Sequence, residues 1–249
     1  MDKIFQIGDF TFRLCCPDEI TPPPNFMLFE RGDTESVSGG GDAGEAEKPQ
    51  YTYRMHVASE LPEPEGKVIA SRPDLVVFEN ERGESRLIGV KGTEGYYACY
   101  QEIGPDCAEI TFAGNRIGGL HIDPVFSSLL ALERRLVKRD NIILHCAYVE
   151  YRGEAILFSA PSETGKTTQA NLWEKYRGSR TVNGDRALLG KRDGRWTAQG
   201  WPVCGTSELC PTDALPIRAV VMLSQAKEHP AATPPPRQAF PLLSRPHTT

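Results

Sequence analysis

The feature that most constrains this chain is the segment 160–168, which reads Ala-Pro-Ser-Glu-Thr-Gly-Lys-Thr-Thr. An apolar run at residues 155–158 precedes it, and a helix-favouring stretch at residues 169–175 follows it. This order predicts a strand, a loop and a helix, with the Gly-Lys pair at the corner where the helix begins. Backbone N–H groups at such a corner point toward an anion, and the helix dipole and the lysine add positive charge. The segment is therefore predicted to bind phosphate, in preference to forming an ordinary glycine-capped turn, although Ala160 stands where the common pattern has its first glycine.

Composition limits the classes of protein to which the chain can belong. The 249 residues carry a formal net charge of −5 and no basic arm, which argues against a nucleic acid partner. No apolar run of roughly eighteen residues is present, so no membrane-spanning helix is expected, and the first residues show no apolar export signal. We therefore expect a cytoplasmic protein that acts on neither nucleic acid nor membrane. The seven cysteines are scattered without a Cys-x-x-Cys pair, which favours reduced thiols over a zinc site.

The first part of the chain, residues 1–120, is predicted to be rich in β-strands. Alternating or continuous apolar patterns typical of strands occur at residues 10–14, 75–78, 87–90 and 96–100. We expect these strands to form an antiparallel domain. Residues 31–50 are rich in Gly, Ser, Asp and Glu and cannot bury much apolar surface, so a mobile loop is expected there.

A second domain is predicted over residues 121–228, followed by a proline-rich tail at residues 229–249. One helix is expected to begin at Asp123 as its N-cap, with Pro124 in the first turn. Its apolar face would contain Val125, Leu129, Leu132 and Leu136. Further strands are predicted at residues 142–149, at 154–159, on either side of a tight hairpin turn at 192–195, and at 215–223, the last as a buried strand.

Phosphoryl transfer needs charge neutralisation, a ligand for Mg²⁺, and a carboxylate for the metal or the nucleophile. Lys166 and Thr167 supply the first two, and Asp185 is the best candidate for the third. Asp185 has a second interpretation, in which residues 183–184 form a turn that it caps. His145 is either a core histidine or a functional one. The loop at residues 201–207 either presents polar groups to a ligand or merely connects two strands.

Several of these segments, in this order, resemble the C-terminal catalytic domain of the HPr serine kinase/phosphorylase family. They are the strand with His145 at residues 144–149, the strand at residues 153–158, the run Gly165-Lys166-Thr167-Thr168, and the run Asn183-Gly184-Asp185-Arg186. The resemblance covers residues 142–223, about a third of the chain. It implies an α/β fold with a mixed β-sheet P-loop core like that of phosphoenolpyruvate carboxykinase. It also implies ATP with Mg²⁺ and the phosphorylation of a hydroxyl group.

The resemblance also implies roles for individual residues. Lys166 would hold phosphates, Thr167 would hold Mg²⁺, and Asp185 would be a metal ligand or base. His145 would lie beside the reacting groups, so the expected catalytic residues are Asp185, His145 and Lys166. The residues expected to bind the nucleotide are Ser162, Thr164, Gly165, Lys166, Thr167 and Thr168, and those expected to bind the metal are Thr167 and Asp185.

Three positions depart from the family pattern, and they leave two functions open. Ala160 replaces the first loop glycine, Glu163 stands where related loops have glycine, and Gly184 stands where the family has the first of two aspartates. Because little chain follows residue 223, the segment that binds HPr is expected to be missing, and HPr is not expected to be the substrate. We expect an ATP- and Mg²⁺-dependent kinase acting on a hydroxyl of a small molecule or peptide. The alternative is a catalytically impaired nucleotide-binding regulatory module.

Overall fold

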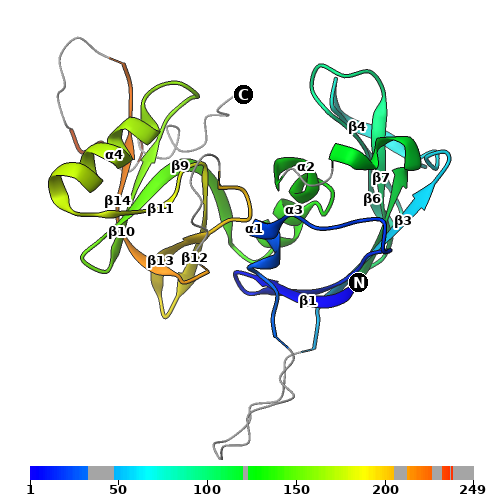
Figure 1. The fold of residues 1–249 in the computed structure, drawn as a ribbon, viewed down its shortest axis with the longest axis horizontal. Helices are drawn as coiled ribbons and strands as arrows, with labels where there is room; N and C mark the ends of the chain where they lie inside the picture. The colour runs from blue at the N-terminus through cyan, green and yellow to red at the C-terminus, as the bar shows by residue number, and fades with distance from the viewer. Residues whose placement is uncertain (33–47, 120–122, 205–211, 226–231, 236, 238–249) are drawn as a thin grey trace, which may run out of the picture. The chain divides into compact units, whose positions relative to one another are not determined.

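A computed structural model of the chain describes residues 1–32, 48–119, 123–204, 212–225, 232–235 and 237. The chain divides into two compact units, Met1–Leu136 and Val137–Thr249. The fold is rich in β-strands, which form two mixed sheets, and has few helices (Figure 1). The expected mobile loop and proline-rich tail fall largely on residues outside this description, as do residues 205–207 of the loop after Trp201. Within the described residues, no helix is both long and apolar enough to span a bilayer.

An eight-stranded sheet forms the frame of the first unit. In spatial order its strands are β1 (Asp2–Ile7), β2 (Phe10–Cys15), β3 (Tyr51–Ala58), β8 (Cys107–Ala113), β7 (Tyr96–Gly104), β6 (Gly83–Gly89), β5 (Leu75–Asn80) and β4 (Lys67–Arg72). The predicted strands are confirmed as β2, β5, β6 and β7. The prediction of an antiparallel domain is wrong in part, because β3 lies parallel to both β2 and β8. The chain on either side of β3 is long enough for the crossovers that parallel pairing requires.

Aromatic side chains form much of the core of the first unit. Phe5, on β1, is fully buried and packs on Phe26 with their ring centroids 4.9 Å apart. Phe26 belongs to the short helix α1 (Pro24–Met27), and it contacts Phe126 of α2 (Asp123–Ser128) edge-on. The short helices are thus held by aromatic contacts with the sheet and with one another.

A helix does begin at Asp123, as predicted, but the prediction that it continues unbroken to Leu136 is wrong, because the structure has two helices, α2 and α3 (Leu132–Val137). Ala131 separates them with a left-handed φ of 46°. Residues 129–132 are all fully buried. A continuous helix would turn part of such a run of four side chains toward solvent, so the break lets the whole run enter the core. A short 3₁₀ helix, η1 (Gly114–Gly119), lies between β8 and α2.

Helix α3 is joined to the sheet by a buried group of arginines and glutamates. Arg134 Nε lies 2.7 Å from Glu102 Oε1, and Arg134 Nη1 lies 2.9 Å from Glu84 Oε2. Arg135 also pairs with Glu102 and donates a hydrogen bond of 2.7 Å to the Tyr51 hydroxyl. Burial raises the pKa of Glu102, but the hydrogen bond from Arg134 and the charge of Arg135 outweigh it and hold the pKa below its ordinary value.

We predict that Glu102→Gln lowers the free energy of unfolding at neutral pH by about 3 kcal/mol, since it removes the carboxylate that pairs with the buried Arg135. A carboxyl whose pKa is lower in the folded state stabilises the fold above its unfolded pKa, about 4.3 for glutamate. The difference between wild type and variant should therefore shrink as pH falls through the lowered pKa. Urea unfolding across this pH range measures it, with Glu81→Gln in an exposed turn as the control. A difference that is equally large at pH 3 would contradict the prediction.

The second unit is a sheet that closes on itself. Its strands are β9 (Ile142–Tyr151), β10 (Glu154–Ser159), β11 (Arg180–Asn183), β12 (Arg186–Arg192), β13 (Arg195–Gly200) and β14 (Leu215–Met222). The spatial order is β10-β14-β13-β12-β9-β11, and an additional β9–β10 pairing completes the ring. The predicted strands and the hairpin turn at residues 192–195 are confirmed. The last strand, β14, is half-buried, so the prediction that it is buried is wrong.

The two faces of β9 and β10 pack against different cores. Leu144, Cys146 and Tyr148 point to one core, together with Leu157 of β10. The intervening residues of both strands form a second core against α4 (Lys166–Arg177), whose Trp173 packs on this face. Figure 1 shows α4 lying along the strands. By this alternation His145 lies on the face that carries α4.

Candidate functional site

The segment 160–165 connects β10 directly to α4, as the sequence predicts. Two residues of this loop have a left-handed backbone, Glu163 with φ of 62° and Gly165 with φ of 105°. At Gly165 such a φ favours glycine, and no heavy atom lies within 4 Å of where a Cβ would be. At Glu163 the same kind of conformation is strained, because a side chain with a Cβ disfavours it. The loop therefore has two positions with the left-handed backbone that glycine favours, and a glycine occupies only one of them.

Lys166, the first residue of α4, is the cation of this corner. Its side chain is largely buried, and Nζ donates hydrogen bonds to the carbonyl oxygens of Ala160 at 3.1 Å and Pro161 at 3.2 Å. Burial lowers the pKa of the amine, and the negative charge of Asp185 opposes this effect. A lysine in such a place gains from any further anion near it, because the anion favours the charged form that burial disfavours.

Asp185 lies between two side chains that can be positively charged. Its Oδ1 is 3.5 Å from His145 Nε2, and its Oδ2 is 3.3 Å from Arg186 Nε. Burial raises the pKa of Asp185, but His145, Arg186 and the charge of Lys166 together hold it below its ordinary value. Asp185 is therefore ionised at neutral pH, which suits a metal ligand better than a proton acceptor.

The position of Asp185 is set by Asn183, the last residue of β11. Asn183 is fully buried, and its Oδ1 accepts hydrogen bonds of 2.9 Å from the backbone N–H groups of both Asp185 and Arg186. Its Nδ2 donates to the carbonyl oxygens of Trp201 and Val203, each at 3.2 Å. The turn of residues 183–184 thus exists, but it is Asn183 that caps it, and the Asp185 side chain points to His145 and Arg186.

His145 is fixed by strand pairing on both sides of β9. On one side it lies opposite Arg186 of β12 in antiparallel register. On the other side its carbonyl oxygen accepts a hydrogen bond of 3.0 Å from Ser159 Oγ, at the end of β10. The structure therefore brings together His145 and Asp185, two of the predicted catalytic residues, and the third, Lys166, is close enough for its charge to act on Asp185.

The remaining predicted nucleotide-binding residues lie along the loop and the first turn of α4. Ser162, Thr167 and Thr168 are exposed, whereas Thr164 is half-buried and its hydroxyl donates to the carbonyl oxygen of Ser162 at 3.4 Å. The hydroxyl of Thr167 and the carboxylate of Asp185 are oxygen ligands of the kind that Mg²⁺ accepts. Within the described part of the chain, no three His, Cys, Asp or Glu residues are grouped as a metal cage. A Mg²⁺ ion held here fits the pattern of few protein ligands completed by phosphate and water.

Two residues of the site were missed by reasoning from sequence. In the sequence, Arg186 is only the last residue of the run 183–186, and Asn183 indicates no more than a turn. The adjacency of Asp185 and Arg186 in the sequence is a usable signal, because a carboxylate beside an arginine often pairs with it. The two hydrogen bonds that Asn183 donates leave no such signal, because Trp201 and Val203 are distant in sequence.

No family model and no curated protein sequence matches this chain. Among solved structures, the HPr(Ser) kinase/phosphatase from Coxiella burnetii matches with a TM-score of 0.30 and 13% sequence identity. The match covers 38% of this chain and 66% of that chain, which is just under two thirds of its length.

We predict that Glu163→Gly tightens ATP binding roughly tenfold, about 1.4 kcal/mol, because it removes a strained backbone and a negative charge beside the phosphates. Asp193→Gly is a matched control, since Asp193 is also acidic, exposed and left-handed, with φ of 51°, but lies in the β12–β13 turn. Calorimetric titration should show a higher affinity for ATP in Glu163→Gly and an unchanged affinity in Asp193→Gly. Weaker binding by Glu163→Gly would instead make Glu163 a working residue of the site.

Proposed function

We propose that the second unit binds ATP with Mg²⁺ and transfers a phosphoryl group to a hydroxyl of a small molecule or peptide. The observation that supports this most is the geometry around α4. A loop with a glycine-type backbone places a buried lysine at the helix start, and an ionised Asp185 lies within range of that lysine's charge. Phosphoryl transfer requires positive charge, backbone N–H groups and a carboxylate close together.

In this proposal each residue has one task. Lys166 and the N–H groups at the start of α4 bind the phosphates, and Thr167 and Asp185 hold Mg²⁺. The bound nucleotide supplies the phosphoryl group. The acceptor hydroxyl oxygen forms the new bond to the terminal phosphorus, the bond from that phosphorus to the bridging oxygen breaks, and ADP leaves with the electron pair. His145, next to Asp185, accepts the hydroxyl proton.

The fold and the partners belong to the same proposal. We propose that the second unit is a P-loop core like that of phosphoenolpyruvate carboxykinase, which the succession of β10, the loop and α4 supports. The proposed partners are a nucleotide and a hydroxyl acceptor. Neither nucleic acid, nor membrane, nor HPr is part of the proposal.

A second candidate function is a nucleotide-binding regulatory module without turnover. Two observations favour it. Glu163 places a carboxylate on a strained backbone within the loop, and Asp185 is engaged by both His145 and Arg186. In such a module the nucleotide still binds, but the Asp185 carboxylate that phosphoryl transfer needs stays paired with His145 and Arg186.

Turnover of labelled ATP, with and without hydroxyl-bearing metabolites and peptides, separates the two functions. For a kinase, Asp185→Asn should leave the affinity for ATP in excess Mg²⁺ within about threefold and reduce turnover by roughly a hundredfold or more, because it removes a metal ligand and keeps the shape. Asp140→Asn, in the turn before β9, is the control. If Asp185→Asn turns over ATP as fast as the wild type does, Asp185 has only a structural role. If the wild type binds ATP but does not turn it over, the regulatory module is favoured.

A further inference from the structure

Arg186 is anchored at its backbone, while its guanidinium lies near the surface. It is the first residue of β12, its N–H is held by Asn183, and it lies opposite His145 in the strand pair. Residues directly opposite in an antiparallel pair point to the same face of the sheet. Arg186 therefore lies on the face that carries α4 and His145, and its side chain is 40% exposed.

A cation bound by the Asp185 carboxylate would compete with the two partners that this carboxylate has, His145 and Arg186. His145 is 19% exposed and belongs to the middle of the sheet, whereas Arg186 is more exposed and has a long flexible stem. Nε of Arg186 lies 3.3 Å from Oδ2 of Asp185. This distance is longer than the roughly 2.7–2.9 Å of a strong charge-assisted hydrogen bond. Of the two partners, Arg186 is the one that can leave.

We infer that Arg186 contacts the terminal, transferable phosphate of the bound nucleotide, exchanging Asp185 for that phosphate when the ligand enters. This inference rests on the proposed function. Lys166 and the loop N–H groups hold phosphates at the start of α4, whereas Arg186 stands beside Asp185 and His145, where the reacting end would be. An arginine at that place neutralises charge on the transferred group, and its planar fork fits phosphate oxygens.

The position of Arg186 predicts discrimination between a triphosphate and a diphosphate. Lys166 would bind phosphates of both nucleotides. A residue that contacts only the terminal phosphate would contribute to the binding of ATP but not of ADP. We therefore expect Arg186→Gln to weaken Mg·ATP binding about tenfold while Mg·ADP binding stays within about twofold. Arg186→Lys should recover part of the loss, because it restores the charge without the fork.

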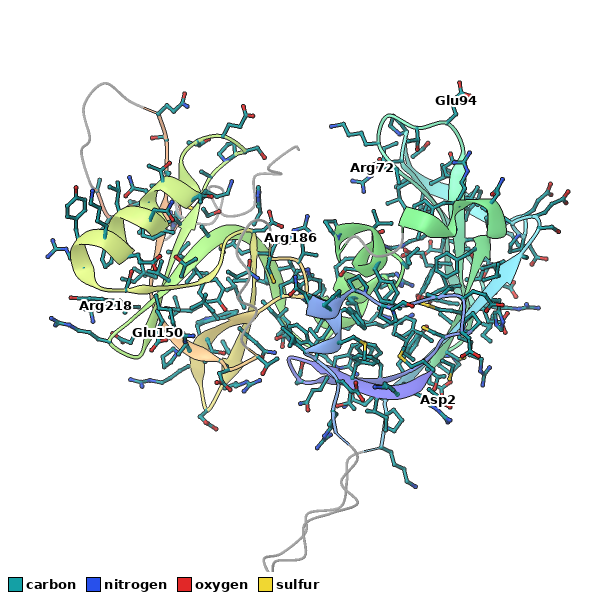
Figure 2. The ribbon with its side chains drawn as sticks, in the orientation of Figure 1. Asp2, Arg72, Glu94, Glu150, Arg186 and Arg218 are labelled. Carbon is teal, nitrogen blue, oxygen red and sulfur yellow. The ribbon has the colours of Figure 1, made fainter. Side chains whose placement is uncertain are left out.

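The experiment is calorimetric titration of the full chain with ATP and ADP in excess Mg²⁺. Arg180→Gln is the matched control, because Arg180 belongs to the same unit and pairs with Glu150 at 2.6 Å with its side chain 56% exposed. Figure 2 shows Glu150 well apart from Arg186. The control should bind both nucleotides as the wild type does.

If Arg186→Gln loses affinity for ATP and ADP equally, the role of Arg186 is merely structural and the inference is overturned. Unchanged ATP affinity would overturn it as well, and would leave the proposed nucleotide site intact. If the wild type binds neither nucleotide, the proposed function itself fails and the role of Arg186 falls with it. Thermal melting of each variant separates a loss of fold from a loss of contact.

Discussion

Strand β9 is hydrogen-bonded to β10, β11 and β12, and these pairings position the side chains of the candidate site. The β10 pairing brings the loop before α4 beside His145, where Ser159 bonds its carbonyl oxygen. The β12 pairing sets Arg186 opposite His145 and so brings Asp185 within 3.5 Å of the imidazole. A register shift of one residue on either side would turn His145 or Arg186 to the opposite face. The arrangement of these side chains therefore depends on the register of one strand.

Electrostatics explains how the charged groups coexist in this small space. Lys166 is buried and its pKa is lowered, and Asp185 is half-buried but remains ionised because positive groups lie close to it. Each group favours the charged form of the other. An entering phosphate would reinforce the charged form of Lys166 and compete with Asp185 for Arg186. The site is thus arranged so that binding an anion rearranges existing ion pairs and creates few new charges.

Much of the second unit was predictable from sequence, because its signals are local. The apolar run of β10, the Gly-Lys pair and the helix-forming stretch of α4 are contiguous, and the left-handed backbone at Gly165 is a local property of the loop. Four of the eight strands of the first unit, β2, β5, β6 and β7, could also be predicted from their alternating or continuous apolar patterns. The parallel pairing of β3 with β2 and β8 could not be predicted, because it joins segments far apart in sequence. The break at Ala131 was missed because a helical pattern does not reveal that four successive residues are all needed in the core. Asn183 was missed for a similar reason, since its partners come from the segment after β13.

If residues 160–168 bind phosphate groups, as we propose, Lys166→Ala removes the positive charge that holds them. Calorimetric titration with Mg·ATP should show binding by the wild type and a loss of about 2–4 kcal/mol in the variant, comparable to breaking a buried charge pair. Lys175→Ala, on the exposed part of α4, should bind as the wild type does. Thermal melting would confirm that both variants are folded. Equal affinity of wild type and Lys166→Ala for ATP would show that this loop does not bind phosphate groups.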